Sequence, residues 1–308
     1  MTTFKTLFGC GGVRGALDAY ARRFDAIELD VLDRAPKAKD ATLRKWRKDA
    51  GPGLRFSLVA PKPLAAVRPG APLDAALTEL LEAQRLVQAR TLLLSTPVEV
   101  TPAALPRERL AKVVERLREG LGEARNVVSI AWEPRGVWEQ ESAAKFAREL
   151  GIDLCADPLA DPREPFWDAS IRYVRLTTVG GRTEFPPARL RALAEILSAA
   201  QQDDIAAGRQ GDRVVIFNTP HAATEVKRLK ALVAQLATRE AGKEIGNVIR
   251  PRGFAIDDEE DEDEEDEDDE DESEDEGGEP GDEPADDDED DDDDDDDDEV
   301  DDEEDEQP

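Results

Sequence analysis

Polar side chains that could do chemistry stand at the ends of short apolar runs along the chain. They comprise four carboxylates, three bases and one amide: Glu28, Asp30, Glu133, Asp157, Lys62, Arg135, Arg175 and Asn218. If the runs are strands of a parallel barrel, their carboxyl ends converge on one mouth, and these side chains would line a polar pocket there. The alternative is that they are ordinary solvated residues of loops.

The bases of this set suit an anionic ligand. Glu133 and Arg135 are two residues apart, so both would lie on the same face of an extended strand. With Arg175 from a nearby strand, Arg135 could form an anion-binding fork, because a guanidinium donates two parallel hydrogen bonds to a carboxylate or phosphate. Lys62 and Asn218 would add further donors. The alternatives are an internal salt bridge, or a strand that Pro134 ends early, turning Arg135 away.

The carboxylates allow two other kinds of chemistry. Glu28 and Glu133 could act as general acid or base on a bound ligand. Glu28, Asp30 and Asp157 could instead offer oxygen ligands to Mg²⁺ or Mn²⁺. The spacing does not choose between these roles, so the sequence assigns no metal and identifies no cofactor.

Histidine and cysteine are scarce, which excludes several kinds of site. His221 is the only histidine, and Cys10 and Cys155 are the only cysteines. One histidine excludes HExxH zinc sites, and two cysteines are too few for a zinc cluster or a disulfide framework. His221 would lie near the pocket at a helix start. Cys10, within the glycine-rich turn of residues 9–12, is a candidate nucleophile; that turn could also present backbone N–H groups to an anion, or be a tight turn only.

The hydrophobic pattern predicts the scaffold that would position these residues. Eight β-type runs alternate with helical patterns, at residues 5–9, 26–31, 54–60, 91–96, 127–132, 152–156, 171–176 and 213–218. Several runs are continuously apolar, as is typical of strands buried on both faces. Eight strands alternating with helices predict a single (β/α)8 TIM-type barrel over residues 1–238, with a doubly wound open sheet as the alternative.

The net charge of −34 comes from the C-terminal end of the chain. Residues 257–308 hold 42 of the 74 acidic residues and none of the 40 basic ones, which leaves the other 256 residues with 32 acids and a net charge of +8. We expect this Asp/Glu-rich tail to be disordered, because it has almost no apolar side chains to bury. Residues 239–256 are predicted to form a basic connector.

The tail allows three roles. It could be a solvated bristle that favours solubility, or it could contact basic partner proteins. It could also bind the basic body and compete there with an anionic ligand, a contact that salt would weaken.

Location is predicted from what the sequence lacks. No apolar run reaches the roughly 18 residues that span a bilayer, and the first residues lack the apolar stretch of a signal peptide. We therefore expect no membrane partner and a cytoplasmic protein.

Five short motifs at the predicted strand ends carry a family resemblance. They are Gly9-Cys10-Gly11-Gly12, Glu28-Leu29-Asp30, Glu133-Pro134-Arg135 with Trp138, Tyr173-Val174-Arg175-Leu176, and Phe217-Asn218. On these motifs the chain resembles the DUF72 (YecE-like) family over about residues 5–237. The resemblance implies a TIM barrel and no established activity. The chain departs from the family pattern at Asp30 (usually Asn), at Val59 (usually Lys, with Lys62 three residues on), at Thr177 (usually His), and at Asp33 and Arg34 (usually aromatic).

Three functions follow from these observations. The first is binding or transformation of a small anionic metabolite, such as a phosphorylated sugar, at the barrel mouth. The second is binding of nucleic acid or another polyanion, with the acidic tail competing for the basic surface. The third is a catalytically inactive barrel that serves as a scaffold.

Overall fold

The computed structural model describes residues 4–13, 15–33, 38–161, 164–178 and 183–248, and of residues 239–248 it describes the backbone only. The acidic tail predicted at residues 257–308 lies outside the described residues, and so does the predicted connector from residue 249 onward.

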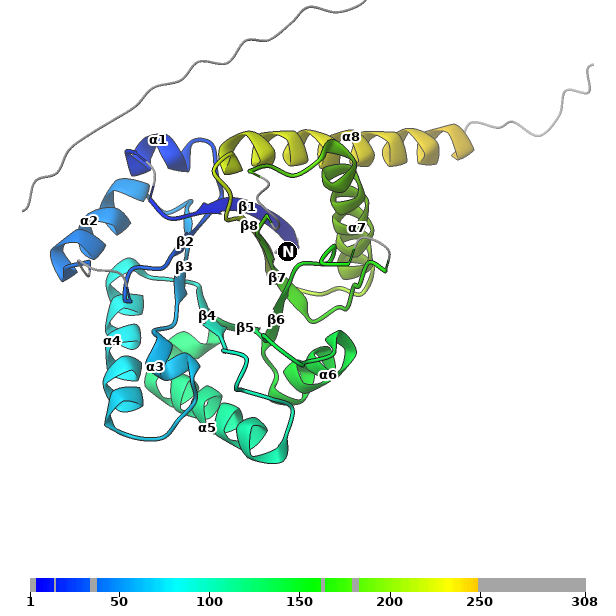
Figure 1. The fold of residues 1–308 in the computed structure, drawn as a ribbon. Helices are drawn as coiled ribbons and strands as arrows, with labels where there is room; N and C mark the ends of the chain where they lie inside the picture. The colour runs from blue at the N-terminus through cyan, green and yellow to red at the C-terminus, as the bar shows by residue number, and fades with distance from the viewer. Residues whose placement is uncertain (1–3, 14, 34–37, 162–163, 179–182, 249–308) are drawn as a thin grey trace, which may run out of the picture. The chain divides into compact units, whose positions relative to one another are not determined.

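Eight parallel strands close into a barrel (Figure 1). They are β1 Lys5–Gly11, β2 Ala26–Leu29, β3 Arg55–Val59, β4 Thr91–Ser95, β5 Ser129–Glu133, β6 Asp153–Ala156, β7 Ile171–Leu176 and β8 Asp212–Phe217. Each strand pairs with the next in the sequence, and β8 pairs with β1, with Leu7 opposite Val214. The predicted TIM-type barrel is confirmed, and each predicted run overlaps one strand. The closed ring excludes the open sheet.

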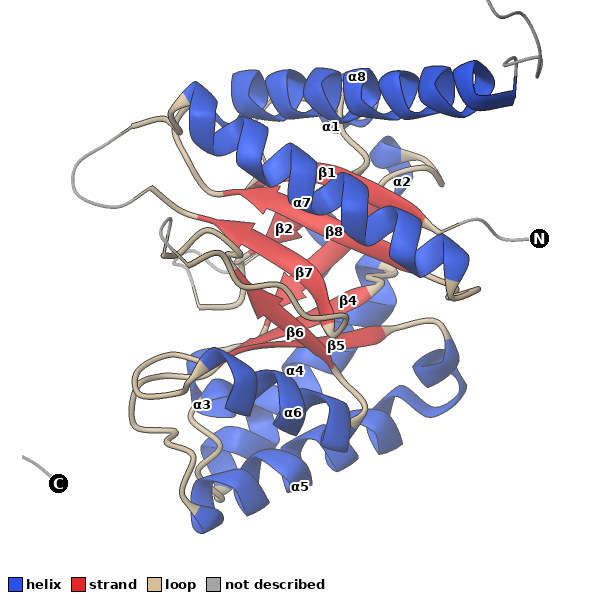
Figure 2. Ribbon diagram, turned by 90° about the vertical axis from the view of Figure 1, so that its right-hand side faces the viewer, coloured by secondary structure: helices blue, strands red, loops and turns tan. Residues whose placement is uncertain are grey.

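Helices surround the strands in the described part of the chain (Figure 2). They are α1 Leu17–Ala21, α2 Asp40–Ala50, α3 Lys62–Ala65, α4 Ala71–Val87, α5 Ala104–Leu121, the 3₁₀ turn η1 Gly122–Asn126, α6 Gln140–Leu150, α7 Pro187–Ala206 and α8 Ala222–Val248. α8 continues ten residues into the segment predicted as a connector. Between β6 and β7 the described residues form no helix; Pro158 and Pro165 lie in this stretch, and proline disfavours a helix interior.

The barrel has a narrow apolar interior, separate from the larger core between strands and helices. Seven side chains form this interior plug: Ala26, Leu93, Ala131, Cys155, Tyr173, Val214 and Ile216. Side chains alternate along a strand, so a residue two positions after a plug residue points to the same side, at the C-terminal mouth. The residues placed in this way are Glu28, Ser95, Glu133, Asp157, Arg175 and Asn218.

Among the described residues, no helix combines the length and the apolar character needed to cross a membrane.

Candidate functional site

Glu28 lies at the centre of the C-terminal mouth and is 2% exposed. Its Oε1 accepts hydrogen bonds from Nε and Nη2 of Arg175 at 3.2 and 2.9 Å, and from Nδ2 of Asn218 at 3.2 Å. Its Oε2 accepts one from the hydroxyl of Tyr173 at 3.0 Å. Both carboxylate oxygens are therefore engaged, as a buried carboxylate requires.

Arg175 joins Glu28 to the second glutamate of the mouth. Its Nη1 donates to Oε2 of Glu133 at 3.0 Å, and the same oxygen accepts from Arg135 Nη2 at 3.3 Å and from the hydroxyl of Ser95. No described residue donates a hydrogen bond to Oε1 of Glu133. The side chain of Glu133 is 20% exposed and that of Arg135 is 55% exposed. Both oxygens of Glu28 thus accept hydrogen bonds within the network, whereas Oε1 of Glu133 accepts none from a described residue.

The charges within this network support one another. Burial by itself lowers the pKa of Arg175, but Glu28 and Glu133 more than offset this and raise it above the ordinary arginine value. Burial also raises the pKa of Tyr173, and Glu28 raises it further. This hydroxyl therefore stays protonated and donates a hydrogen bond to the carboxylate of Glu28. Arg175 and Tyr173 are therefore a permanent cation and a permanent donor beside Glu28.

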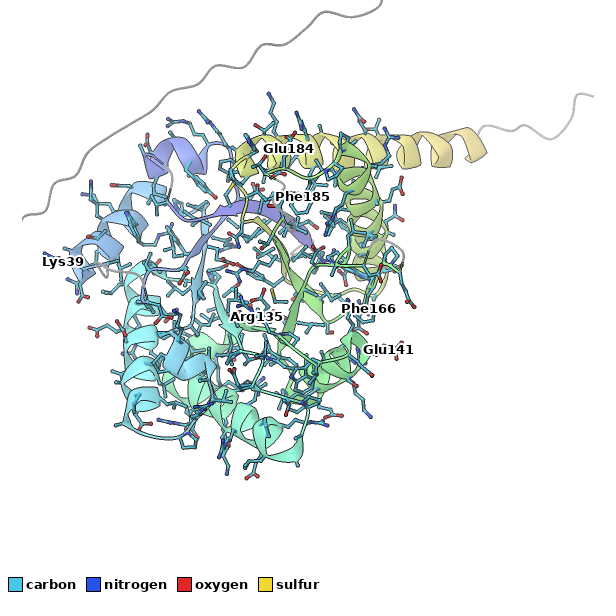
Figure 3. All side chains as sticks on the ribbon, in the orientation of Figure 1. Lys39, Arg135, Glu141, Phe166, Glu184 and Phe185 are labelled. Carbon is cyan, nitrogen blue, oxygen red and sulfur yellow. The ribbon has the colours of Figure 1, made fainter. Side chains whose placement is uncertain are left out.

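The predicted anion-binding fork takes a different form in the structure. Arg175 is an internal salt-bridge residue, because its guanidinium contacts two glutamates and is only 15% exposed. β5 ends at Glu133, directly before Pro134, so Arg135 lies in a loop rather than on the strand. Arg135 still returns to Glu133, and it lies inside the ring of strands when the barrel is viewed along its axis (Figure 3). Both guanidinium groups converge on one oxygen of Glu133 instead of on an open space.

Two contacts hold the loop that carries Arg135. Gly136 has a φ of +82°, and a Cβ there would lie 3.1 Å from the backbone of Val98, so the loop packs closely on its neighbour. The indole N–H of Trp138 donates to the carbonyl of Val100 at 2.6 Å, and its ring packs edge-on against Trp132. Trp132 and Trp138 thus pack in the core between strands and helices and hold the loop beside the mouth.

The glycine-rich turn after β1 makes room for the network. A Cβ on Gly11 would lie 1.8 Å from Oδ1 of Asn218, so a side chain at Gly11 would displace the amide that binds Glu28. Gly12, with a φ of +76°, donates its N–H to the carbonyl of Glu28 at 2.8 Å. This donor is used within the fold, which supports the tight-turn interpretation over an anion-binding turn.

Three of the predicted site residues are not members of this network. Asp157 accepts hydrogen bonds from Arg189 at 2.7 Å and from the backbone N–H of Leu159 at 2.9 Å. Burial raises its pKa above the ordinary value, because these two interactions offset only part of the effect of burial. Lys62 begins α3 with an exposed side chain, and its backbone N–H donates to Asp33 at 2.7 Å. Asp30 follows β2 and is half-buried. The structure therefore joins five of the eight predicted residues.

Other candidates from the sequence have structural roles. The carbonyl of His221 accepts the backbone N–H groups of Thr224 and Glu225 at the start of α8, and its side chain is exposed. Cys10 is buried. Cys155 is buried beneath the mouth, where burial, and after it Glu133, raise the pKa of its thiol and keep it protonated. Across the described residues, no group of three or more His, Cys, Asp or Glu side chains is placed to hold a metal ion.

Ser95 and Tyr173 were missed as site residues by the sequence reasoning. Ser95 is the polar residue that ends the apolar run of β4, and Tyr173 lies two positions before Arg175 and so on the same face of β7. Both signals are visible in the sequence, but only the barrel shows that Tyr173 meets Glu28, 145 residues away.

Comparisons with known proteins agree with this architecture. A family model described as "Protein of unknown function DUF72" matches residues 9–249. The fold is similar to that of a DUF72 family protein from Enterococcus faecalis, at 14% identity and a TM-score of 0.60, over 76% of this chain and 98% of that one. A DUF72 family protein from Thermotoga maritima matches at 13% identity and a TM-score of 0.53, over 76% of this chain and 99% of that one. A comparison with curated proteins gives no match.

Proposed function

The chain belongs to the DUF72 family, whose function is unknown, and from this premise we propose that the C-terminal mouth of its barrel binds a small anionic metabolite, such as a phosphorylated sugar. One observation carries the proposal. Glu133 presents an oxygen to which no described residue donates, beside the exposed guanidinium of Arg135, on top of a buried and fully paired network.

The two glutamates of the network have different roles. Glu28 has donors on both oxygens, so it is a positioning residue that orients Arg175. Arg175 in turn orients Glu133. This assignment moves the acid–base role from Glu28, which the sequence also suggested, to Glu133 alone.

Arg135 supplies the contact to the anion. Its guanidinium has one hydrogen bond to Glu133 at 3.3 Å, and more than half of the side chain is exposed, so most of its donors can turn to a ligand. Guanidinium groups bind phosphate and carboxylate in a planar, two-point geometry. Arg135 thus replaces the two-arginine fork expected from the sequence.

Glu133 would exchange a proton with the bound metabolite at Oε1, because three donors occupy Oε2. A general base needs a heavy-atom distance of about 2.6–3.2 Å to the group that it deprotonates. A hydroxyl or an acidic C–H next to the anionic group would meet this requirement when the anion binds Arg135.

The test is a thermal-shift screen of the full chain with ribose 5-phosphate, glucose 6-phosphate and 3-phosphoglycerate, each beside its unphosphorylated counterpart. A ligand at 100 times its dissociation constant stabilises the fold by about 2.7 kcal/mol, which is several degrees for a domain of this size. We expect a phosphorylated probe to raise the melting temperature. This rise should be lost in Arg135→Ala and kept in Glu133→Gln, whereas chemical conversion of the bound probe should be lost in Glu133→Gln.

The matched control is Arg44→Ala, which removes an exposed arginine from α2 and not from the mouth network. Equal loss of the shift in Arg135→Ala and Arg44→Ala would contradict the assignment of Arg135. No shift from any probe would favour the scaffold hypothesis.

A further inference from the structure

A cavity opens at the N-terminal mouth of the barrel, opposite the candidate site. Its volume is about 750 Å³, within the range of roughly 300–1,000 Å³ typical of small-ligand sites. The first residues of five strands line it: Arg55, Thr91, Ser129, Asp153 and Asp212. Four of these residues lie two positions before a residue of the interior plug, as the mouth residues lie two positions after one.

Arginines dominate the lining of this cavity. Five of them contribute, from five different parts of the chain: Arg55, Arg90, Arg118, Arg125 and Arg172. Among the described residues, the only carboxylates that join them in the lining are Asp153 and Asp212. Burial raises the pKa of Asp153 to about 6, so this carboxylate loses its negative charge readily in mildly acidic solution.

The guanidinium groups are weakly paired. Nε of Arg55 lies 3.7 Å from Asp212, and Nη2 of Arg172 lies 3.9 Å from Asp204, both longer than a charge-assisted hydrogen bond. Asp204 is also shared with Arg209 and Arg213.

Of the other three arginines, Arg90 and Arg118 have only backbone partners within the described chain, and Arg125 forms no hydrogen bond or ion pair with a described residue. Nη2 of Arg118 donates to the carbonyls of Leu150 and Gly151 at 2.7 and 2.8 Å, and Nη1 of Arg90 donates to that of Val127 at 3.5 Å. No described carboxylate lies within 4 Å of Arg90, Arg118 or Arg125. The cavity therefore gathers positive charge that the described residues do not neutralise, and a concave wall focuses such a field.

We propose that this cavity binds a compact anion that carries several phosphate groups, of the tripolyphosphate class. Arg55 is on β3 and Arg172 precedes the middle of β7, so they approach from opposite sides of an eight-stranded barrel. A single phosphate is too small to contact both sides of a 750 Å³ space, whereas a chain of phosphates can. Bidentate guanidinium contacts suit each phosphate in turn. The site is separate from the C-terminal mouth and does not depend on the function proposed there.

The test is calorimetric titration of the full chain with tripolyphosphate at low ionic strength, where charges are weakly screened. The variant is Arg90→Ala with Arg125→Ala, because neither arginine has a carboxylate partner whose charge would be left unpaired. The control is Arg44→Ala with Arg191→Ala, which removes the same charge from exposed positions on α2 and α7. Loss of one ionic hydrogen-bonding group weakens binding by about tenfold, so we expect about a 100-fold loss for the variant and none for the control.

Several outcomes would overturn the proposal. One is no measurable binding of tripolyphosphate, and another is equal binding by variant and control. A third is equally tight binding of orthophosphate, which would show a single-phosphate site. Displacement of tripolyphosphate by a poly-glutamate peptide at equal charge concentration would show a surface for carboxylate polymers. Titration of Arg135→Ala, which removes the anion contact proposed at the C-terminal mouth, isolates the binding signal of this cavity; loss of that signal in Arg135→Ala would overturn the proposal.

Discussion

The two mouths of the barrel differ in how closely their arginines pair with carboxylates. At the C-terminal mouth, Arg175 is shared between Glu28 and Glu133 at 2.9 and 3.0 Å. At the N-terminal mouth, five arginines and two carboxylates line the cavity, and the shortest ion pair that these arginines form with a described residue is 3.7 Å long. Where arginines and carboxylates pair closely, the ion pairs hold the side chains in place. Where arginines outnumber the carboxylates, the excess positive charge favours binding of an anion. Position in the barrel does not by itself identify the anion site.

Burial explains the difference. At the C-terminal mouth, Glu28 is buried and Arg175 is mostly buried, so an unpaired charge on either would be strongly unfavourable, and each has a partner of opposite charge. At the N-terminal mouth, Arg90 and Arg125 are exposed and the other three arginines are partly exposed, so water and salt screen the repulsion between their like charges.

The largest expected effect comes from removing the shared cation. Arg175→Met leaves the buried carboxylate of Glu28 without its guanidinium, and we expect the free energy of unfolding to fall by about 3–5 kcal/mol. Urea unfolding measures this loss. The paired control is Arg125→Ala at the other mouth, for which we expect a change within about 0.5 kcal/mol. Similar losses in both variants would erase the distinction between the two mouths.

A second experiment uses pH to sharpen the comparison. The pKa of Asp153 is raised to about 6 from 3.8 by burial, so its native form binds a proton more tightly than its unfolded form. The stability that it contributes is present below the unfolded pKa and is lost as pH rises toward 6. Asp153→Asn removes this titrating group. The free energy of unfolding of Asp153→Asn minus that of the unaltered chain should therefore rise between pH 4 and pH 8, by at most about 3 kcal/mol, since one pKa unit is 1.36 kcal/mol. A stability difference that does not change between pH 4 and pH 8 would contradict this cause.

The smallest effect expected is the loss of one donor from the balanced network. Tyr173→Phe removes the hydrogen bond to Oε2 of Glu28 and keeps the ring that fills the plug. A hydrogen bond to a charged group contributes about 1.5–3 kcal/mol, and we expect the lower end, because Arg175 and Asn218 stay in place. Chemical denaturation checks the value. A neutral result would mean that Glu28 is satisfied without Tyr173.

Most of the barrel was predictable because its signals are local. The run of residues 91–96 and the 3-4 spacing from Leu110 to Leu121 each identify an element within a few residues, and a βα alternation repeated eight times leaves few topologies. The end of α8 was not predictable in this way. It continues to Val248 through residues that composition alone marks as a connector.

The candidate site was predictable in membership but not in pairing. Sequence alone determined that Glu28, Glu133, Arg175 and Asn218 lie at or next to strand ends at one mouth, because strand direction and the two-residue alternation follow from local pattern. Only the tertiary structure decided that Arg175 serves the two glutamates rather than a ligand, and that arginines from five separate parts of the chain line the other mouth. The physical reason is that partners of a buried charge are chosen by distances across the closed barrel, and residues 28 and 175 become neighbours only when β8 pairs with β1.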